Sequence, residues 1–348
     1  MILKTVLKLE ARAFVLSLFC VCLLACERPP AFETVVLSGA TMGTTYNIKV
    51  VVPNGERHSA EKLQIAIDSR LQAFNQSLST YISDSEIVTL NQAPVGEWLP
   101  VSERFLAVLT LSQQISQLSG GAFDATVAPL VNLWGFGPDW KAHKAPAASD
   151  IEQALLSIGY QYIEIDSAQS RIKKLIDVSL DFSAVAKGYG VDEIAELLWA
   201  EGFHHFMVEI GGELRLHGHN GEGKTWRIGV ESPAAGGKIR PIAVSEVGVA
   251  TSGDYRNYFE QDGVRFSHTI NPKTGYPVQQ ELASVTVLAK NCMTADAWAT
   301  AFMVLGYKKG YDLAIANNLA VLFLLKEGEE FKEISTPNFK KLTKEHAS

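Results

Sequence analysis

The sequence predicts an α+β fold whose sheets are mostly antiparallel. Segments with helical periodicity alternate with short strand-like runs at hairpin spacing, and neither type is confined to one half of the chain. No repeat, charge block or Pro/Ser-rich linker interrupts residues 34–340, so these residues are expected to form one domain. With 348 residues, of which 47 % are hydrophobic, the chain is long enough to bury a large core.

The first half of the chain is expected to contain a strand pair followed by three helices. The strands are predicted at 34–38 and 44–52, and the helices over about 58–78, from Ser102 to Gly120, and from a capping box at Ser149 and Glu152. Apolar residues of the first helix recur every three or four positions and would form its buried face: Leu63, Ile67, Leu71, Phe74 and Leu78.

The second half is expected to be richer in strands. Strands are predicted near 161–166 and 176–182, a helix over about 185–201, and several short strands between 204 and 288. The chain is expected to end with a helix from about 295, another near 308–317, and a strand at 320–325.

The amino terminus has the pattern of an export signal. A basic stretch with Lys4, Lys8 and Arg12 precedes the apolar run 13–25, which is shorter than the ~20 residues that span a bilayer. The ending Leu-Leu-Ala-Cys26 resembles the lipobox of bacterial lipoproteins, in which the cysteine becomes the lipidated first residue. We therefore expect a signal peptide over 1–25, then a lipidated Cys26 and a tether over 26–33, with an ordinary signal peptide or an uncleaved anchor as the alternatives.

Cysteine usage and charge limit the function classes. Cys20 and Cys22 would leave with the signal and Cys26 would carry lipid, so only Cys292 remains and no disulfide framework is expected. Removal of residues 1–25 takes away three basic and one acidic residue, which changes the net charge from −7 to −9. An acidic surface argues against nucleic acid as a partner, although backbone amides and a lysine can still bind an anionic ligand locally.

Three segments of the first half combine glycines, small residues and aromatic rings. The segment 41–46, with Met42 and Gly43, could approach a ligand closely or could simply be a hairpin turn. Tyr81 follows a helix end, where its ring could stack on a planar group, while the serines after it would cap a short helix. The segment 119–126, with Ala122, Phe123 and Asp124, could hold a flavin or nucleotide, or could serve only as a helix C-cap.

Two later segments carry the chemistry of a phosphate and a divalent cation. A strand ending at Asp181 and a helix that begins near Ala184 and contains Lys187 would direct amides and an ammonium at one point, which suits phosphate. Asp296 and Thr300 are four apart on one helix face, and a carboxylate with a hydroxyl suits Mg²⁺. The alternatives are a solvated lysine, an Asp296 that caps its helix and a Thr300 that bonds back to a carbonyl.

His268 is a candidate working imidazole because it precedes a turn rich in proline and glycine. Most other histidines are expected to be structural or solvated: His204, His205, His217 and His219. The Cys/His pattern matches no zinc site.

Taken in order, these segments closely resemble the FAD:protein FMN transferases, the ApbE family of flavin-handling lipoproteins. The resemblance covers roughly residues 34 to 325. The matching segments are Gly-Ala-Thr-Met-Gly-Thr-Thr-Tyr, Ser-Thr-Tyr-x₃-Ser-Glu, Gly-Gly-Ala-Phe-Asp-x-Thr-Val-x-Pro-Leu, Asp-x₅-Lys-Gly-Tyr-x-Val-Asp, Gly-Gly-Glu, Ala-Thr-Ser-Gly-Asp-Tyr, His-x-Ile-x-Pro-x-Thr-Gly and Ala-Asp-Ala-x-Ala-Thr.

The resemblance implies an ApbE-like, T-fold-like domain with two intimately packed subdomains, and it implies roles for named residues. Asp296, Thr300 and the backbone oxygen of Ala184 would hold Mg²⁺, and His268 would be the catalytic base. Family members often carry glycine at Ser183 or Ala184, a change that a carbonyl ligand tolerates. The residues implied to contact FAD are Met42, Tyr81, Ala122, Phe123, Asp124, Asp181, Lys187 and Ile270.

The implied activity is transfer of FMN from FAD to a threonine hydroxyl of an acceptor protein, with release of AMP. The implied acceptors are subunits of sodium-pumping NADH:quinone reductase and of Rnf-type electron-transport complexes, at the periplasmic face of the inner membrane. A lipid anchor would hold catalyst and acceptor at that membrane. Two alternatives stay open: a Mg²⁺-dependent FAD pyrophosphatase that yields FMN and AMP, and a non-catalytic flavin-binding lipoprotein.

Overall fold

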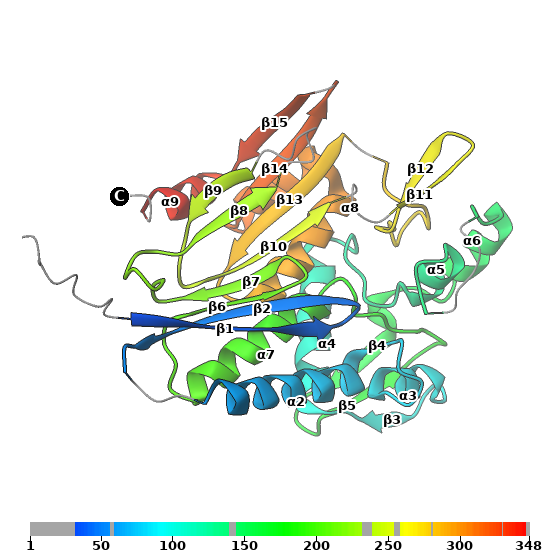
Figure 1. Cartoon of the computed structure of the whole chain (residues 1–348). Helices are drawn as coiled ribbons and strands as arrows, with labels where there is room; N and C mark the ends of the chain where they lie inside the picture. The colour runs from blue at the N-terminus through cyan, green and yellow to red at the C-terminus, as the bar shows by residue number, and fades with distance from the viewer. Residues whose placement is uncertain are drawn as a thin grey trace, which may run out of the picture.

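A computed structural model describes residues 32–55, 59–138, 144–231, 239–253, 258–279, 281–328 and 330–345. The expected signal peptide, Cys26 and most of the tether lie outside these residues. The α+β class with antiparallel sheets is confirmed, because every strand pair in the main sheet is antiparallel (Figure 1). Within the described residues, no helix has the length and apolar character needed to cross a bilayer.

Eight strands form the main sheet, in the order β1-β2-β6-β7-β10-β13-β14-β15. They are β1 (Phe32–Thr41), β2 (Thr44–Pro53), β6 (Phe206–Ile210), β7 (Glu213–His217), β10 (Val247–Gly253), β13 (Leu282–Ala289), β14 (Ala320–Glu327) and β15 (Glu330–Ser335). Three small sheets accompany it: β3 (Trp98–Pro100), β5 (Arg171–Lys174) and β4 (Ile163–Asp166); β8 (Arg227–Glu231) and β9 (Ile239–Ala243); β11 (Tyr258–Gln261) and β12 (Val264–Ser267).

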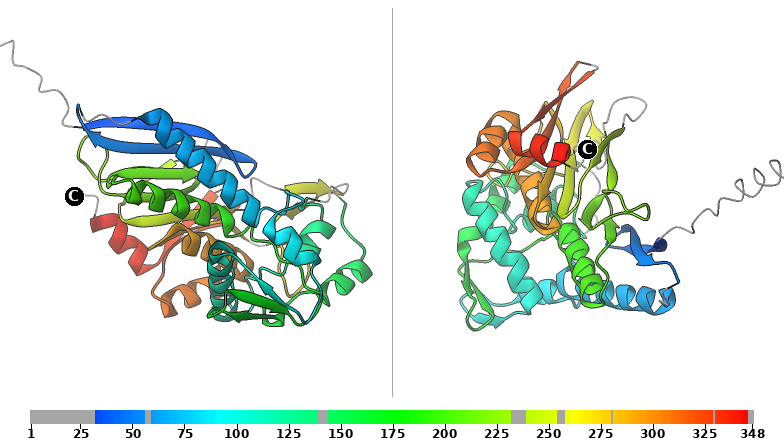
Figure 2. Two further views of the ribbon diagram at one scale, coloured as in Figure 1. Left: turned by 90° about the horizontal axis from the view of Figure 1, so that it is seen from below. Right: turned by 90° about the vertical axis from the view of Figure 1, so that its left-hand side faces the viewer.

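The helices surround the sheet on both faces and at one side. They are α2 (Ala60–Leu78), α3 (Glu86–Gln92), α4 (Glu103–Leu118), α5 (Ala128–Leu133), α6 (Ala148–Leu155), α7 (Ala186–Ala200), α8 (Cys292–Ala316) and α9 (Pro337–Glu345), with a 3-10 turn at Tyr160–Tyr162. Helices α2, α7 and α8 pack on one face, while β8, β9 and α9 cover the other (Figure 2).

Alternation of side chains along β2 explains how this strand divides two cores. Tyr46, Ile48 and Val50 are buried against α2 and α7, whereas Val51 points to the opposite face, toward Trp226 of the β8 side. Successive side chains of a strand point to opposite faces, so a strand with buried residues of both parities must be covered on both sides. The sheet is therefore the middle layer of the domain.

Helix α2 buries the face that its periodicity predicts. Leu63, Ile67, Leu71, Phe74 and Leu78 are all buried, and Ser59 caps the helix by accepting a hydrogen bond from Lys62 N at 3.2 Å. The helix from Ser102 is likewise confirmed: Ser102 is the N-cap of α4, which ends just before Gly120 and Gly121, both with positive φ.

Two sequence predictions about element boundaries are wrong. Residues 176–182 form no strand: the segment packs into the core but forms a single bridge, Val127 with Ser179, and the strand lies instead at β5. Ser149 does not cap α6, because Ala147 is already extended at the cap position and the helix begins at Ala148. The two helices predicted from about 295 and at 308–317 are confirmed: α8 begins at Cys292, with Asn291 as its cap, and Gly306 divides it into two parts.

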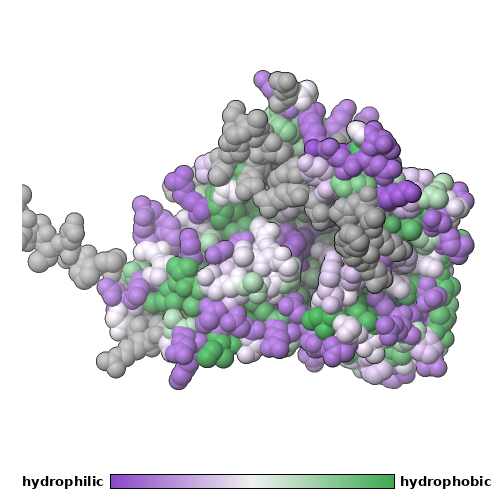
Figure 3. Space-filling view, turned by 45° about the vertical axis from the view of Figure 1, so that its right-hand side comes forward, coloured by the Kyte–Doolittle hydropathy of each residue, from purple (hydrophilic) through white to green (hydrophobic). Residues whose placement is uncertain are grey.

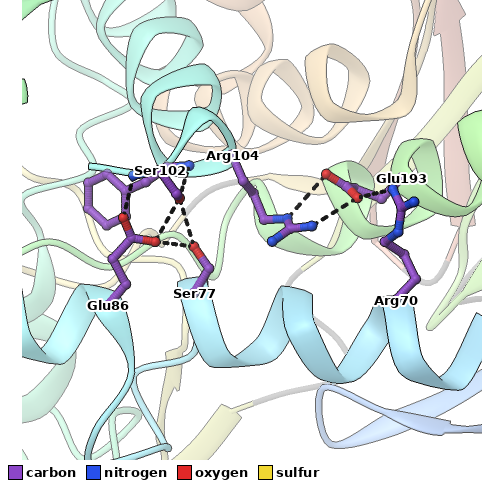
Figure 4. Close-up of polar contacts among 7 residues, drawn as sticks. Arg70, Ser77, Glu86, Ser102, Arg104 and Glu193 are labelled. Carbon is purple, nitrogen blue, oxygen red and sulfur yellow. Dashed lines mark hydrogen bonds and ion pairs between the residues drawn. The ribbon is translucent and has the colours of Figure 1, made fainter. Parts of the chain in front are cut away.

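Partly buried polar contacts join α2 and α4 to α7, and a second group of contacts joins α3 to α2 and to the start of α4 (Figure 4). Glu193 of α7 accepts hydrogen bonds from Arg104 at 3.1 and 3.2 Å and from Arg70 at 3.2 Å. Glu86 of α3 accepts from Ser102 N at 2.6 Å and from the hydroxyl of Ser77 at 2.5 Å. Charge-assisted bonds of this kind hold helices in one register, and here they orient the helix that carries Lys187.

Replacement of Glu193 by glutamine should destabilise the fold in a pH-dependent way. Burial raises the pKa of Glu193, but the guanidinium groups of Arg104 and Arg70 outweigh it and lower the pKa below its ordinary 4.5. The variant should lose about 1–3 kcal/mol of unfolding free energy at pH 7. Because a depressed folded-state pKa stabilises the fold above the unfolded pKa, the difference should disappear as the pH falls through the lowered pKa of Glu193.

Chemical denaturation of the wild type and Glu193→Gln between pH 3 and 7 measures this effect. Glu327→Gln serves as the control, because Glu327 and its partner Lys332 are both exposed and such a pair contributes little. An equal loss in both variants, or a difference that does not change with pH, would contradict the assignment.

Candidate functional site

Two tight turns meet at the amino-terminal end of α7. Between β1 and β2, Met42 and Gly43 both have positive φ, 50° and 70°, so segment 41–46 is a two-residue hairpin turn. Its tip lies on α7, since a Cβ added to Gly190 would come within 2.5 Å of Met42 Cε. The hairpin interpretation of this segment is therefore right, and the turn also brings Met42 close to Lys187.

The second turn, between β6 and β7, places an acidic residue beside Lys187. Gly211 and Gly212 have φ of 61° and 106°, and the next residue, Glu213, begins β7. The amide of Gly211 donates to Thr45 O at 3.1 Å, which ties this turn to the β1–β2 hairpin. Lys187 Nζ lies 2.6 Å from Glu213 Oε1.

Asp181 lies in an irregular connection that lines up with the segment 122–126. Its amide donates to Ala125 O at 2.8 Å, and its Oδ1 accepts from the amide and the hydroxyl of Ser183 at 2.7 and 2.5 Å. The amides of Val185 and Ala186 both donate to the carbonyl of Phe182, so the chain turns sharply into α7. This short turn leads from Asp181 into the first turn of α7, which contains Lys187, without the strand that the sequence predicts.

Helix α8 crosses α7 at Gly188. Asp296 Oδ2 accepts a hydrogen bond from Gly188 N at 2.9 Å, and a Cβ at Gly188 would lie 2.5 Å from Cys292 O and 2.7 Å from Asp296 Cβ. Only glycine permits this approach. Asp296 thus lies in the second turn of α8, buried against α7, and does not cap its own helix.

The amino terminus of α8 is held by Asp192 of α7. Asp192 accepts from Cys292 N at 2.9 Å and Met293 N at 2.8 Å, and it also pairs with Arg215 at 3.0 Å. A carboxylate on the first free amides of a helix is favourable for both hydrogen bonding and the helix dipole. Asp192 therefore sets where the remaining side chains of α8 lie.

One turn after Asp296, Thr300 faces the main sheet. Its hydroxyl lies 3.2 Å from the hydroxyl of Ser252 in β10, so a side-chain hydrogen bond joins α8 to the main sheet. The segment Ala250–Gly253 of the sequence motif therefore contributes Ser252 to the site. Asp254 and Tyr255 of the same motif lie outside the described residues.

Lys187, Glu213 and Asp296 form one electrostatic unit. Burial alone would lower the pKa of Lys187, but the negative charges of Asp296 and Glu213 outweigh it and the pKa is raised, so the lysine stays protonated. Burial raises the pKa of Glu213 to about 7, although Lys187 opposes this rise, and burial also raises the pKa of Asp296. An additional cation nearby would favour the charged form of both carboxyl groups.

The donor set fits a hard divalent cation. In a regular helix the amide of Gly188 would donate to the carbonyl oxygen of Ala184. Here it donates to Asp296 instead, so this amide does not occupy the Ala184 carbonyl oxygen. A carboxylate, a hydroxyl and a carbonyl oxygen are the ligands that Mg²⁺ accepts, with water or phosphate completing the shell. Among the described residues no group of three or more His, Cys, Asp or Glu side chains is placed to hold a metal.

The segment 119–126 is more buried than the sequence suggests. Ala122, Phe123 and Asp124 are each less than a tenth exposed, and the Phe123 ring belongs to the main hydrophobic core. Asp124 accepts hydrogen bonds from the amide and hydroxyl of Thr126 and from Tyr160 N, all within 2.9 Å. The Phe123 ring is therefore part of the packed interior, and its contact with FAD, which the resemblance implies, stays a prediction.

Tyr81 and His268 lie on either side of Phe136. Tyr81 is 68 % exposed and donates from its hydroxyl to Phe136 O at 3.3 Å, while the ring of Phe136 meets the His268 ring edge-on at 6.4 Å. Partial burial and the nearby Asp181 carboxylate raise the pKa of Tyr81. These contacts place His268 and Asp181 on the same side of the molecule as an exposed aromatic ring.

Ile270 lies in the turn after His268, where its side chain is buried. It forms a bridge with Pro277 and packs with Trp134, whose indole nitrogen donates to Gly275 O at 2.8 Å. Trp134 is thus a core residue. The side of the molecule that carries α5, α6, β11 and β12 is hollowed near its centre, between hydrophilic and intermediate surface (Figure 3).

The four other histidines that the structure describes are structural or solvated, as expected. His205 and His219 stack at 3.7 Å, His217 pairs with Glu246 at 2.7 Å, and Trp199 packs on both His204 and His217. Sequence reasoning missed three residues of the site: it assigned no role to Glu213, Asp192 or Ser252. All three lie within the ordered motifs quoted above, and that membership was the available signal.

Comparison with known proteins agrees along most of the chain. A sequence model of the ApbE family matches residues 42–323. A protein of Vibrio cholerae named FAD:protein FMN transferase is 43 % identical over 332 residues, which cover 94 % of this chain and 98 % of that protein. A protein of the same name from Haemophilus influenzae is 41 % identical over 328 residues, covering 92 % and 94 %.

Solved structures give the same result for the fold. The flavin transferase ApbE from Vibrio cholerae superposes with a TM-score of 0.84 at 42 % identity, covering 89 % of this chain and 99 % of that one. The apo form of the Pseudomonas stutzeri flavinyl transferase ApbE superposes with a TM-score of 0.83 at 40 % identity, covering 90 % and 97 %.

Proposed function

Because the chain belongs to the ApbE family, we propose that it is an FAD:protein FMN transferase that moves FMN from FAD to a threonine hydroxyl of an acceptor protein. The main structural support is the junction of α7 and α8, where Asp296 accepts a hydrogen bond from the residue that follows Lys187. The Lys187 segment has the chemistry of a phosphate site and the Asp296 segment that of a cation site. One hydrogen bond, from Gly188 N to Asp296, therefore joins the two segments.

FAD would lie along the start of α7, with its pyrophosphate near Lys187. The raised pKa keeps this lysine cationic at all physiological pH values, and the first amides of α7 add a favourable dipole. Met42 from the hairpin tip and the exposed Tyr81 ring offer apolar surface for the flavin or adenine. The backbone of 122–124, Asp181 and the backbone of Ile270 would complete the FAD contacts.

Transfer needs charge stabilisation at phosphorus and a base for the acceptor hydroxyl. The threonine oxygen would attack the phosphorus on the FMN side of the pyrophosphate; a new P–O bond forms, the bond to the AMP phosphate breaks, and AMP departs with its electron pair. His268 would accept the hydroxyl proton, since an imidazole of ordinary pKa ~6.5 is suited to that role near neutrality. An Mg²⁺ ion held by Asp296, Thr300 and Ala184 O would offset charge on the phosphoryl oxygens.

The wild-type protein, mixed with FAD, Mg²⁺ and an acceptor domain that carries the threonine, provides the direct test. Mass spectrometry of the acceptor should show the gain of one attached FMN, with AMP released in equal amount. Release of free FMN and AMP without a gain in acceptor mass would instead indicate a pyrophosphatase. Bound FAD that is not converted would indicate a flavin-binding protein without this activity.

The acceptors we propose are subunits of sodium-pumping NADH:quinone reductase or Rnf-type complexes at the periplasmic face of the inner membrane. A lipid on Cys26 would restrict this protein to the same surface. The described chain begins at β1, whose first residue lies at the opposite side of the molecule from α5, α6 and β12 (Figure 1). An anchor before Phe32 would leave the His268 side open to an acceptor.

Cys26→Ser should abolish lipidation and move the protein from the membrane fraction to the soluble periplasmic fraction. The thiol is the atom that would carry the lipid, and a serine hydroxyl is not an equivalent acceptor for it. Incorporation of a labelled fatty acid and cell fractionation measure both effects. Equal label and equal membrane content in the wild type and the variant would refute the anchor, and Cys292→Ser serves as the thiol control.

A further inference from the structure

Glu213 is a buried carboxylate that packing alone does not explain. The residue is 3 % exposed. Of its two carboxylate oxygens, Oε1 pairs with Lys187 Nζ at 2.6 Å. Its Oε2 is buried and accepts no hydrogen bond from any residue that the structure describes. Leaving a buried acceptor unsatisfied costs about 1–3 kcal/mol, so this oxygen calls for a donor from outside the described residues.

The turn before Glu213 is shaped to bring this carboxylate to Lys187. Gly211 and Gly212 both adopt positive φ, and a Cβ on Gly211 would meet Thr44 Cγ2 at 2.9 Å and Lys187 Cδ at 3.4 Å. A larger residue at Gly211 would therefore press on the stem of the lysine. This close approach allows Glu213, the first residue of β7, to form its ion pair with the ammonium of Lys187.

Asp296 is a second carboxylate whose charge acts on Lys187. Which of the two carboxylates pairs with the ammonium determines whether Asp296 can bind a cation. Asp296 is the carboxylate that we assign to the cation. An ammonium that paired with Asp296 would occupy the position that a cation needs. Two carboxylates compete for one lysine, and the ion pair seen in the structure is with Glu213.

We propose that Glu213 is a positioning residue that holds the Lys187 ammonium at the phosphate site and away from Asp296, so that Asp296 remains available to the cation. The inference rests on the proposed function, whose cation and phosphate sites it connects. The free Oε2 is consistent with it: Mg²⁺ carries water into its sites, and a water molecule is the donor that this oxygen lacks.

Glu213→Gln tests the proposal, because glutamine keeps the size of the side chain and removes its charge. Lys187 should then turn to Asp296, and calorimetric titration with Mg²⁺ in the presence of FAD should show affinity weakened by about 10- to 100-fold. The double variant Glu213→Gln/Lys187→Ala should bind Mg²⁺ more tightly than Glu213→Gln, because the competing ammonium is gone. Glu246→Gln removes a carboxylate that pairs with His217 just before β10, away from Lys187, and should bind Mg²⁺ like the wild type.

The outcomes separate this inference from the proposed function. Wild-type Mg²⁺ affinity in Glu213→Gln, or a double variant as weak as the single one, would overturn the positioning role even if the wild type transfers FMN. A wild type that binds Mg²⁺ and FAD but transfers no FMN would overturn the proposed function and leave the affinity comparison intact. Thermal unfolding in EDTA measures the structural cost of losing the ion pair, so that it can be separated from the change in Mg²⁺ affinity.

Discussion

Asp296→Ala should lower FMN transfer by at least about a thousandfold, while FAD binding falls much less. A bound cation contributes several kcal/mol of charge stabilisation at a phosphoryl group, and 4 kcal/mol corresponds to roughly a thousandfold in rate. Asp296 is the only carboxylate in the proposed ligand set, so no other anionic ligand of that set remains to hold the ion. Rates of acceptor flavinylation with saturating FAD and Mg²⁺ measure the first effect, and flavin fluorescence measures the second.

Asp296→Asn separates the two contacts of this side chain. Asparagine can still accept the hydrogen bond from Gly188 N but lacks the charge that a cation needs. Its unfolding temperature should therefore stay near that of the wild type while transfer is lost. Asp312→Ala, an exposed change in the last turns of the same helix, should retain activity. Transfer within tenfold of the wild type in either Asp296 variant would remove Asp296 from the cation site.

Gly188→Ala should both destabilise the protein and abolish activity. The added Cβ would lie 2.5 Å from the carbonyl oxygen of Cys292 and 2.8 Å from its carbon, and backbone atoms held by Asp192 cannot move aside easily. Overpacking of this kind typically costs about 1–3 kcal/mol, and here it would also separate Asp296 from the amide beside Lys187. Chemical denaturation and the flavinylation rate measure the two consequences.

Gly190→Ala is the matched comparison for stability. It adds the same methyl group two residues further along α7, but the one close approach of that group is to the flexible end of Met42, while Ile210 Cδ1 lies at an ordinary 3.6 Å. Alanine also gains about 1 kcal/mol of helix propensity over glycine at either position. We therefore expect Gly190→Ala to be close to the wild type in unfolding free energy. Equal stability of the two variants would show that α7 and α8 do not approach as closely as described.

The errors of sequence reasoning have local causes. The segment 176–182 is apolar and extended like a buried strand, but it has no ladder partner beyond one bridge, and apolar periodicity does not report partners. The Ser149 pattern resembles a capping box, yet Ala147 after Pro146 is already extended and the helix starts before Ser149 can cap it. By residue type the flat ring of Phe123 suits a ligand platform, but in the structure it packs in the main hydrophobic core. Burial is decided by the whole fold and not by residue type.

What the sequence determined by itself was whatever depends on near neighbours along the chain. It predicted the buried face of α2 and the lysine at the start of α7, and it placed Asp296 and Thr300 on one helix face because four residues make about one helical turn. The ordered motifs also identified the family.

Only the tertiary structure decided which of these groups act together. The contacts of Lys187 with Glu213 and of Gly188 with Asp296 join residues 26 and 108 positions apart, and no local spacing encodes them. They arise because two glycine turns and a glycine crossing let β7, α7 and α8 approach within hydrogen-bonding distance. Close packing of distant backbones therefore turns separate residue patterns into a single site.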